Sequence, residues 1–236
     1  MLKIDHLYAG YGAFEVLFDL SLTVNEGEWV SLIGTNGAGK TTLLNTIARL
    51  HDPAQGKIVF DGIDITSYQS HQIGKLHLSY MAEGHPIFNH LTVKENLELG
   101  GIAAKLPFKK QQEKIKEIYS LFPLLEERSK QRAGTFSGGE QQLLTLARCL
   151  MGSPKLILCD EPTLGLSPLR VKELFKILKT LHQQGTALLL VEQNVEQALS
   201  FCDKAYILEQ GVIKLTGTGA EILRNPEVKK VYLGYE

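Results

Sequence analysis

The first third of the chain carries its apolar residues in short runs, each with the length of a single β-strand. These runs are rich in β-branched residues and are separated by turn-forming residues, such as the pair Asp61-Gly62. Runs of this length and composition, bounded by turns, favour strands over helices. We therefore expect strands at residues 2–7, 21–24, 30–33 and 57–60.

Between about residues 92 and 151 the apolar positions take the spacing of α-helices. Thr92 precedes one helix-forming run, and Glu95 follows three residues later, where it can complete a capping box. Residues 109–122 repeat apolar positions every three or four residues, which places those positions on one helical face. They are Ile115, Ile118, Leu121 and Phe122. This part of the chain is predicted to be mostly helical.

The last third alternates strand-like and helix-like segments. Strands are expected at residues 156–159, 187–191 and 205–208, with helices at 171–181 and 196–201. This alternation predicts a mainly parallel sheet covered by helices on both faces. The helical middle interrupts the alternation and is interpreted as an inserted lobe. Because no linker rich in Pro, Gly or Ser separates the two parts, we expect the lobe to pack closely on the core.

The composition is that of an ordinary soluble globular protein. The 236 residues are 44% hydrophobic and 22% charged, and the formal net charge is -1. This balance disfavours a general nucleic-acid binder, so we expect no nucleic-acid partner. The sequence lacks any run of about 18 apolar residues, so we expect no membrane span. Cys149, Cys159 and Cys202 are spaced too widely for a metal knuckle or a disulfide framework, which predicts buried, reduced thiols.

The strongest functional pattern is the segment from Gly34 to Thr41, which matches G-x-x-x-x-G-K-[ST] in full. Glycines let successive backbone N–H groups turn toward phosphate oxygens, and the N-terminus of the following helix adds partial positive charge. Lys40 is expected to reach the β- and γ-phosphates, and the Thr41 hydroxyl to hold Mg²⁺. The predicted nucleotide-binding residues are Gly34, Thr35, Asn36, Gly37, Ala38, Gly39, Lys40, Thr41 and Thr42.

Two acidic residues, Asp160 and Glu161, end the apolar run at 156–159. In proteins with such a loop, an acid at the end of a buried strand serves Mg²⁺, a role that suits Asp160. Glu161 is then placed to orient or deprotonate the attacking water. Adjacent carboxylates beside phosphates repel each other unless a cation is present, which supports a metal site.

A second glycine-rich segment follows Phe136. Ser137 and Glu140 can form a capping box, which any helix might have. Gly138 and Gly139, however, weaken a helix start by roughly 1 kcal/mol each relative to alanine, so their presence indicates close backbone approach by a ligand. Two phosphate-binding devices in one chain require either two ligands or one ligand shared between chains.

These segments together resemble the ATP-binding subunits of ABC transporters over essentially the whole chain. Gly34 to Thr41 is similar to the Walker A loop, residues 156–161 to the Walker B strand, and Ser137 to Gln141, by way of Gly138, Gly139 and Glu140, to the signature motif, normally Leu-Ser-Gly-Gly-Gln. The resemblance implies an α/β fold: a P-loop ABC ATPase core with a mainly parallel sheet flanked by helices, an N-terminal antiparallel β subdomain and an inserted helical subdomain. It implies one ABC domain over residues 1–236, with the helical subdomain at about 84–152. In this family the signature of one subunit closes on ATP held by the other, in a head-to-tail dimer.

Other site residues follow from the resemblance position by position. Tyr11 matches the aromatic residue that stacks on adenine. Glu83 replaces the usual coupling-loop glutamine, Ser167 an aspartate, and Gln193 the switch histidine. A glutamate at 83 can still bind Mg²⁺, so the implied metal ligands are Thr41, Glu83 and Asp160. Gln193 can hydrogen-bond a phosphate but cannot be an imidazolium, so catalysis by Glu161 and Gln193 should depend more on Glu161.

The departures resemble one subfamily, the LivF-like ATPases of branched-chain amino acid importers. The similar segments are residues 82–84, 137–142, 164–168, 191–194 and 231–234. The subfamily implies ATP and Mg²⁺ as cofactors and a location at the cytoplasmic face of the cell membrane. It also implies as partners a second, LivG-like ATPase or another copy of the chain, two membrane permeases and, indirectly, an external substrate-binding protein.

Several alternative functions stay open or are disfavoured by particular residues. Related importer ATPases serve urea or amides. A soluble ABC ATPase acting on ribosomes or DNA usually has two fused cassettes or long insertions, which this chain lacks. A module that holds ATP without hydrolysing it is disfavoured by Lys40, Asp160 and Glu161, and a P-loop GTPase by the absence of an Asn-Lys-x-Asp motif.

Overall fold

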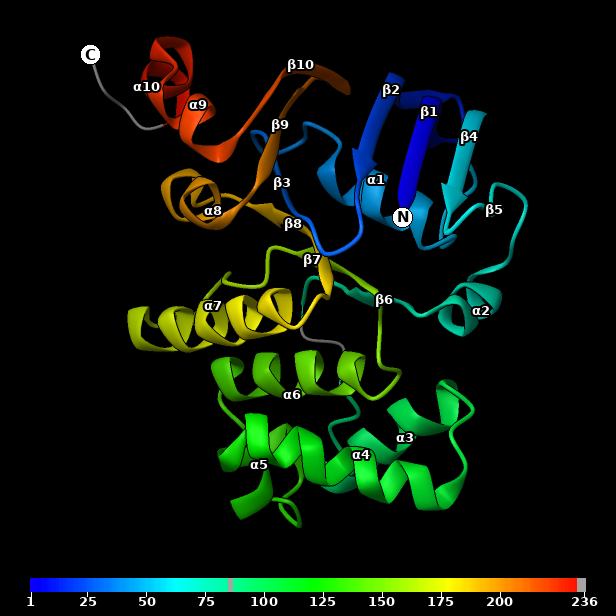
Figure 1. Ribbon diagram of the computed structural model, residues 1–236, viewed down its shortest axis with the longest axis vertical. Helices are drawn as coiled ribbons and strands as arrows, with labels where there is room; N and C mark the ends of the chain where they lie inside the picture. Colours follow the sequence, from blue (N-terminus) through cyan, green and yellow to red (C-terminus); the bar gives the residue numbers. More distant parts are fainter. Residues whose placement is uncertain (85–86, 233–236) are drawn as a thin grey trace.

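Figure 1 shows the computed structural model, which describes residues 1–84 and 87–232. Within these residues the larger sheet has six strands in the order β10-β9-β3-β8-β7-β6. Neighbouring strands are parallel except for the antiparallel pair β9 and β10, so the prediction of a mainly parallel sheet is confirmed. Its strands are β3 (Trp29–Ile33), β6 (Leu78–Met81), β7 (Leu156–Asp160), β8 (Ala187–Glu192), β9 (Lys204–Glu209) and β10 (Val212–Gly217).

The central strands β3, β7 and β8 are buried at every residue, which accounts for their continuous apolar sequences. Two helices follow them in the chain, α7 (Pro168–Gln183) after β7 and α8 (Val195–Phe201) after β8. Asp160 and Glu192 are the last residues of two adjacent parallel strands. The sheet therefore presents these two carboxylates at the same edge.

The N-terminal antiparallel sheet implied by the family resemblance is present, with the strand order β2-β1-β4-β5. Two strands are longer than predicted, because residues 8–11 and 14–20 are also in strand conformation. His6 and Asp19 have positive φ, and the pairing register shifts along both strands. Such bulges break the two-residue alternation from which a strand is predicted. The strands are β1 (Leu2–Tyr11), β2 (Phe14–Val24), β4 (Gln55–Phe60) and β5 (Ile63–Asp64).

Helix α1 (Lys40–Ile47) packs between the two sheets. Its side chains Leu43, Leu44 and Ile47 are fully buried and belong to one apolar cluster with residues of both sheets, such as Leu2 and Val30. This packing fixes the helix, and with it the loop that precedes it, against the edge of the sheet where the carboxylates lie.

The helical middle occupies the lower part of Figure 1, away from the antiparallel sheet. Thr92 and Glu95 form the predicted capping box at its first helix. A second apolar cluster joins these helices to the sheet, since Leu97 and Ile115 share it with Ile157 and Leu190. The helices are α3 (Val93–Ala103), α4 (Phe108–Leu121), α5 (Pro123–Glu127) and α6 (Gly138–Leu150).

Some elements were not predicted. β6 and β10 are the edge strands of the larger sheet, and their conformation depends on pairing with β7 and β9. The described chain also has the short helices α2 (Ser70–Ile73), α9 (Gly219–Arg224) and α10 (Pro226–Tyr232), of which α2 and α10 were not predicted. The cysteine prediction was partly wrong. All three thiols are free, but only Cys159 is buried; Cys149 and Cys202 are half-buried at the margins of the helices.

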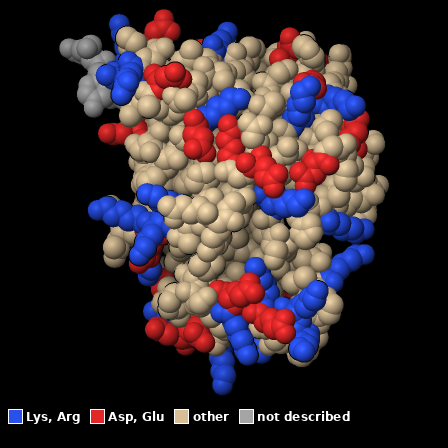
Figure 2. All heavy atoms as spheres, viewed as in Figure 1, with Lys and Arg blue, Asp and Glu red and all other residues tan. Residues whose placement is uncertain are grey.

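Figure 2 shows acidic and basic side chains interspersed over the face seen in Figure 1. Among the described residues, every helix is too short or too polar to cross a lipid bilayer. The last two residues of the segment 231–234, which contributed to the subfamily resemblance, lie outside the described residues.

Candidate nucleotide-binding site

The loop from Gly34 to Gly39 connects β3 to α1, the context that the sequence predicted. Gly39 has a φ of 106°, and a Cβ at this position would lie 2.7 Å from Cδ2 of Leu17. No other residue type fits this conformation and space without strain. The backbone N–H of Gly211 donates to the Ala38 carbonyl at 3.0 Å, which ties the loop to the β9–β10 turn.

Lys40 is the first residue of α1, directly after the loop, and its side chain is buried. The ammonium group donates to the carbonyls of Gly34 at 2.9 Å and Thr35 at 3.2 Å. Nζ also lies 3.6 Å from Oε1 of Glu161. The one cation of the loop is thus directed at the place where the loop would enclose a phosphate, with the proposed base beside it.

Asp160 is fully buried at the end of β7. The Thr41 hydroxyl donates to Oδ1 at 3.3 Å, and the Tyr80 hydroxyl donates to Oδ2 at 3.1 Å. Burial raises the pKa of Asp160, and the nearby charges of Glu161 and Glu83 act in the same direction, against the two hydrogen bonds. A divalent cation would remove this electrostatic cost.

The residues present suit Mg²⁺ bound jointly with a nucleotide. Within the described chain, no three His, Cys, Asp or Glu residues converge as an all-protein metal cage does. Mg²⁺ bound to a triphosphate needs only one or two protein oxygens, since phosphates and waters supply the rest. The Thr41 hydroxyl and the Asp160 carboxylate form such a pair. Glu83 and Thr41 line one hollow at the phosphate loop.

Glu161 adopts an unusual backbone conformation for a non-glycine residue, with φ at 44°. Its N–H donates to the Val191 carbonyl at 2.9 Å, which fixes this residue against β8. Its carboxylate lies between two side chains, with Oε1 facing Lys40 and Oε2 accepting a hydrogen bond from Nε2 of Gln193 at 2.5 Å. Strained backbone of this kind occurs at functional sites. The structure thus brings the two predicted catalytic residues into direct contact.

Two polar residues of the site, the half-buried Tyr80 and the buried Glu192, were missed by sequence reasoning. Tyr80 holds Asp160 from β6, and burial beside the Asp160 charge raises the pKa of Tyr80 well above its usual range. Glu192 accepts hydrogen bonds from the backbone N–H groups of Thr163 at 3.0 Å and Gln193 at 3.2 Å. Burial raises the pKa of Glu192, against these bonds. It therefore connects the loop after Glu161 to the residue that contacts Glu161.

One hollow collects about half of the predicted site residues. It is lined by residues of the phosphate loop together with Glu83, Glu161 and Gln193. Tyr11 is not among its lining residues; it ends β1, is half exposed and lies against His51, with the two rings tilted by 34° and their centroids 4.6 Å apart. The signature residues are also absent from this lining. Within the described residues, one chain therefore supplies only part of the predicted site.

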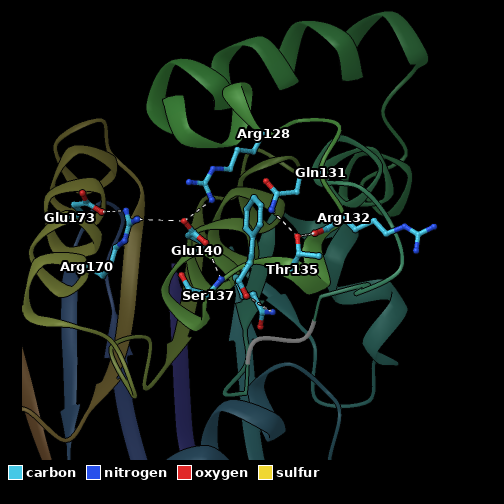
Figure 3. Close-up of polar contacts among 10 residues, drawn as sticks. Arg128, Gln131, Arg132, Thr135, Ser137, Glu140, Arg170 and Glu173 are labelled. Atoms are coloured by element: carbon cyan, nitrogen blue, oxygen red, sulfur yellow. Dashed lines mark hydrogen bonds and ion pairs between the residues drawn. The ribbon is translucent and has the colours of Figure 1, made fainter.

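The signature segment lies at the start of α6, in the helical part of the chain (Figure 3). Ser137 and Gly138 are exposed, whereas Glu140 is buried beneath them. The Ser137 N–H donates to Oε2 of Glu140 at 2.9 Å, which completes the predicted capping box. Nε2 of Gln141 donates to the Phe136 carbonyl at 3.2 Å. Ser137 and Gly138 thus lie at the surface, outside the lining of the hollow formed by the phosphate loop.

Comparison with known proteins agrees with this geometry. The profile of the family described as "ABC transporter" matches residues 17–164. The chain is 45% identical to the high-affinity branched-chain amino acid transport ATP-binding protein BraG of Pseudomonas aeruginosa, over 99% of this chain and 100% of BraG. It is 37% identical to the lipopolysaccharide export ATP-binding protein LptB of Haemophilus influenzae, over 99% and 97%. It is 35% identical to a probable LivF of Archaeoglobus fulgidus, over 99% of each.

A solved structure described as the ADP conformation of an ATP-binding cassette of an ABC transporter superposes with a TM-score of 0.85. It is 26% identical and covers 100% of this chain and 99% of its own. The chain therefore belongs to the ATP-binding subunits of ABC transporters. It is an ATPase of this class, with ATP as its nucleotide.

Proposed function

We propose that this chain powers the import of branched-chain, hydrophobic amino acids through a membrane ABC transporter. The full-length similarity to BraG carries this proposal. The similarity to LivF supports it further. Lipopolysaccharide export is the rival, because LptB relatives also match over nearly the whole chain at lower identity. A related importer for urea or amides is a further alternative.

The geometry supports a specific order of events at the nucleotide. The loop N–H groups bind the triphosphate. As it binds, Lys40 exchanges its contacts with the Gly34 and Thr35 carbonyls for contacts with phosphate oxygens. This exchange also releases Oε1 of Glu161, which is left to accept a proton from the attacking water while Gln193 holds Oε2. Mg²⁺, held by Thr41 and Asp160 with Glu83 nearby, would neutralise charge that develops on the phosphates.

We further propose that the exposed signature completes the site of a second subunit. Ser137, Gly138 and Gly139 would close on ATP bound by a LivG-like ATPase or by a second copy, and Tyr11 would stack on adenine. Residues 84–152 would act as the helical subdomain that transmits closure to two permeases at the cytoplasmic face of the membrane. An external binding protein would deliver the amino acid to those permeases.

The test is transport by the reconstituted complex. The chain is co-purified with its co-encoded ATPase and permeases, placed in proteoliposomes and supplied with the co-encoded binding protein. We expect ATP-dependent uptake of leucine, isoleucine or valine, and none when the chain carries Glu161→Gln. Uptake of urea or amides alone would move the protein to those importers. Extraction of lipopolysaccharide, with no permease that accepts amino acids, would overturn the import proposal.

A further inference from the structure

Glu140 places a buried negative charge directly under the signature glycines. Its residue is only 8% exposed, and it is the third residue of α6, where the family motif normally has glutamine. A capping box can be completed by either glutamate or glutamine. The hydrogen bond from Ser137 therefore does not require the charge. A carboxylate this close to a phosphate-binding helix start would repel an approaching triphosphate unless other charges cancelled it.

Two arginines from different elements approach the same carboxylate oxygen (Figure 3). Nη1 of Arg128 donates to Oε1 of Glu140 at 3.0 Å, and Nη2 of Arg170 lies 3.7 Å from it. Burial acts to raise the pKa of Glu140, but the bonds from Ser137 and the two guanidinium charges outweigh it and lower this pKa. Glu140 is thus ionised at neutral pH and is neutralised locally by arginine.

Arg170 also packs on Gly139, the second of the two signature glycines. A Cβ built at Gly139 would lie 3.0 Å from Cγ of Arg170, so the stem of this arginine packs on that glycine. Arg170 is in the first turn of α7, a few residues after Glu161 in the chain. Its Nη1 is held by Glu173 at 2.7 Å. A second contact joins the same two regions, because Nε2 of Gln142 donates to the Pro162 carbonyl at 2.8 Å.

We propose that Arg170 and Glu140 are positioning residues that couple the signature glycines to the segment following Glu161. In this arrangement Arg170 cancels the charge of Glu140, so that the signature can accept the terminal phosphate of ATP bound by the other subunit. The inference rests on the proposed function, since it requires a signature that acts on a second subunit. The two arginines do not touch that ATP; they set the charge and shape of the surface that does.

The experiment separates charge from packing in the full-length chain with its partner ATPase. The background is Glu161→Gln, in which ATP closes the dimer without being hydrolysed, and size exclusion gives the ATP concentration for half-maximal closure. Arg170→Met keeps the stem over Gly139 and removes the charge, whereas Arg170→Lys keeps a charge. Glu140→Gln keeps the cap and removes the carboxylate. Lys114→Met is the matched control, because Lys114 forms an ion pair of 2.9 Å with Glu117 on α4.

We expect Arg170→Met to raise the half-maximal ATP concentration by about two- to fivefold, the range of a partly exposed ion pair. Arg170→Lys and Lys114→Met should change it by less than about twofold. Adding Glu140→Gln to Arg170→Met should restore the parent value, because the charge that needed cancelling is gone. In chains with Glu161 intact, Arg170→Met should raise KM for ATP more than it lowers kcat.

Two results would count against the inference, and a third would count against the proposed function. Arg170→Met that closes like its parent would show that the pair has no role in closure. A defect that persists after Glu140→Gln is added would show that Arg170 acts on phosphate or by packing, not by cancelling Glu140. A parent that binds ATP yet never closes, alone or with the partner ATPase, would instead refute the shared site of the proposed function. Thermal unfolding of each variant shows whether the chain itself is folded.

Discussion

The nucleotide hollow and the signature segment both contain glycines at a helix start, but they differ in how far the chain's own groups hold that helix start in place. In the hollow, Gly39 is required by the chain's own packing against Leu17, and Lys40 is held by carbonyls of its own loop and by Glu161. At the signature, Ser137 and Gly138 are exposed, and the contacts with the rest of the chain are made by Glu140 beneath them and by the stem of Arg170 on Gly139. The first region is complete without a partner; the second is prepared for one.

This difference indicates how one chain can belong to two sites. A hollow whose polar groups already have partners in the same chain keeps its geometry before nucleotide arrives, which favours catalysis by fixed groups. An exposed helix start can bind a phosphate brought by another molecule. We therefore expect variants of the hollow to change nucleotide binding or chemistry in the isolated chain, and variants of the signature to matter only after subunits meet.

The largest expected effect is on the chemical step. Glu161→Gln keeps the side-chain volume and a hydrogen-bonding end but removes the base, and loss of a general base lowers the rate by about 10²- to 10⁴-fold. Lys40, Thr41 and Asp160 remain, so ATP should still bind, and the closed dimer should accumulate. Phosphate release and nucleotide titration measure the two properties separately. Hydrolysis at the wild-type rate would exclude Glu161 as the base.

Gln193→Ala is the comparison for that variant. Its amide makes one hydrogen bond with the Glu161 carboxylate, so its loss should slow turnover by about tenfold at most, less than loss of the base itself. Steady-state rates of both variants in the reconstituted complex decide the order. A greater loss from Gln193→Ala would reverse the roles assigned to these two residues.

Local sequence patterns identified the parts of the hollow that are continuous in the chain. The phosphate loop and the pair Asp160-Glu161 were predicted because each stands where an apolar strand ends. Tyr80 was missed because it reaches Asp160 only when β6 lies beside β7, a pairing that no local pattern specifies. The contact of Arg170 with Glu140 likewise depends on how α7 packs beside α6. These contacts thus depend on long-range strand order and helix packing, which local sequence patterns do not specify.

A smaller effect is expected on nucleotide affinity. Lys40→Ala removes a charge-assisted contact to phosphate worth about 1.5–3 kcal/mol, so ATP affinity should fall about 10- to 150-fold in the isolated chain. It also leaves the buried Glu161 without its cation. Lys155→Ala is the control, because that exposed lysine pairs with Asp61 at 2.7 Å and does not line the nucleotide hollow. Equal affinities of wild type and Lys40→Ala would show that the loop does not bind phosphate through this residue.

Asp160→Asn should exchange function for stability. The pKa of Asp160 is raised in the folded chain, so ionisation at neutral pH opposes folding, and the amide removes this cost. We expect the nucleotide-free variant to melt about 2–4 °C higher at pH 7, corresponding to roughly 1 kcal/mol.

The sign of the pH dependence checks this cause. In wild type the destabilisation by ionised Asp160 is fully present above the folded pKa of this group. It disappears as the pH falls through that value toward the ordinary one. The stabilisation by Asp160→Asn should therefore shrink at low pH. A variant that melts lower than wild type at pH 7 would contradict the assigned cost.

The smallest effect on stability should come from the signature, and it separates the two regions most directly. Gly138 is a helical residue with an exposed backbone, so Gly138→Ala should leave the isolated chain unchanged or stabilise it by less than about 1 kcal/mol. Gly39→Ala places a methyl group against Leu17 at positive φ and should destabilise the same chain by more than about 1 kcal/mol. In the Glu161→Gln background, however, the methyl of Gly138→Ala would stand between the helix start and the incoming phosphate, and ATP-driven closure should weaken. Urea unfolding of the isolated chain and size exclusion of the subunit pair measure the two effects. If Gly138→Ala unfolds the chain as Gly39→Ala does, its glycine serves the chain's own fold, and the distinction between a complete hollow and a surface prepared for a partner is wrong.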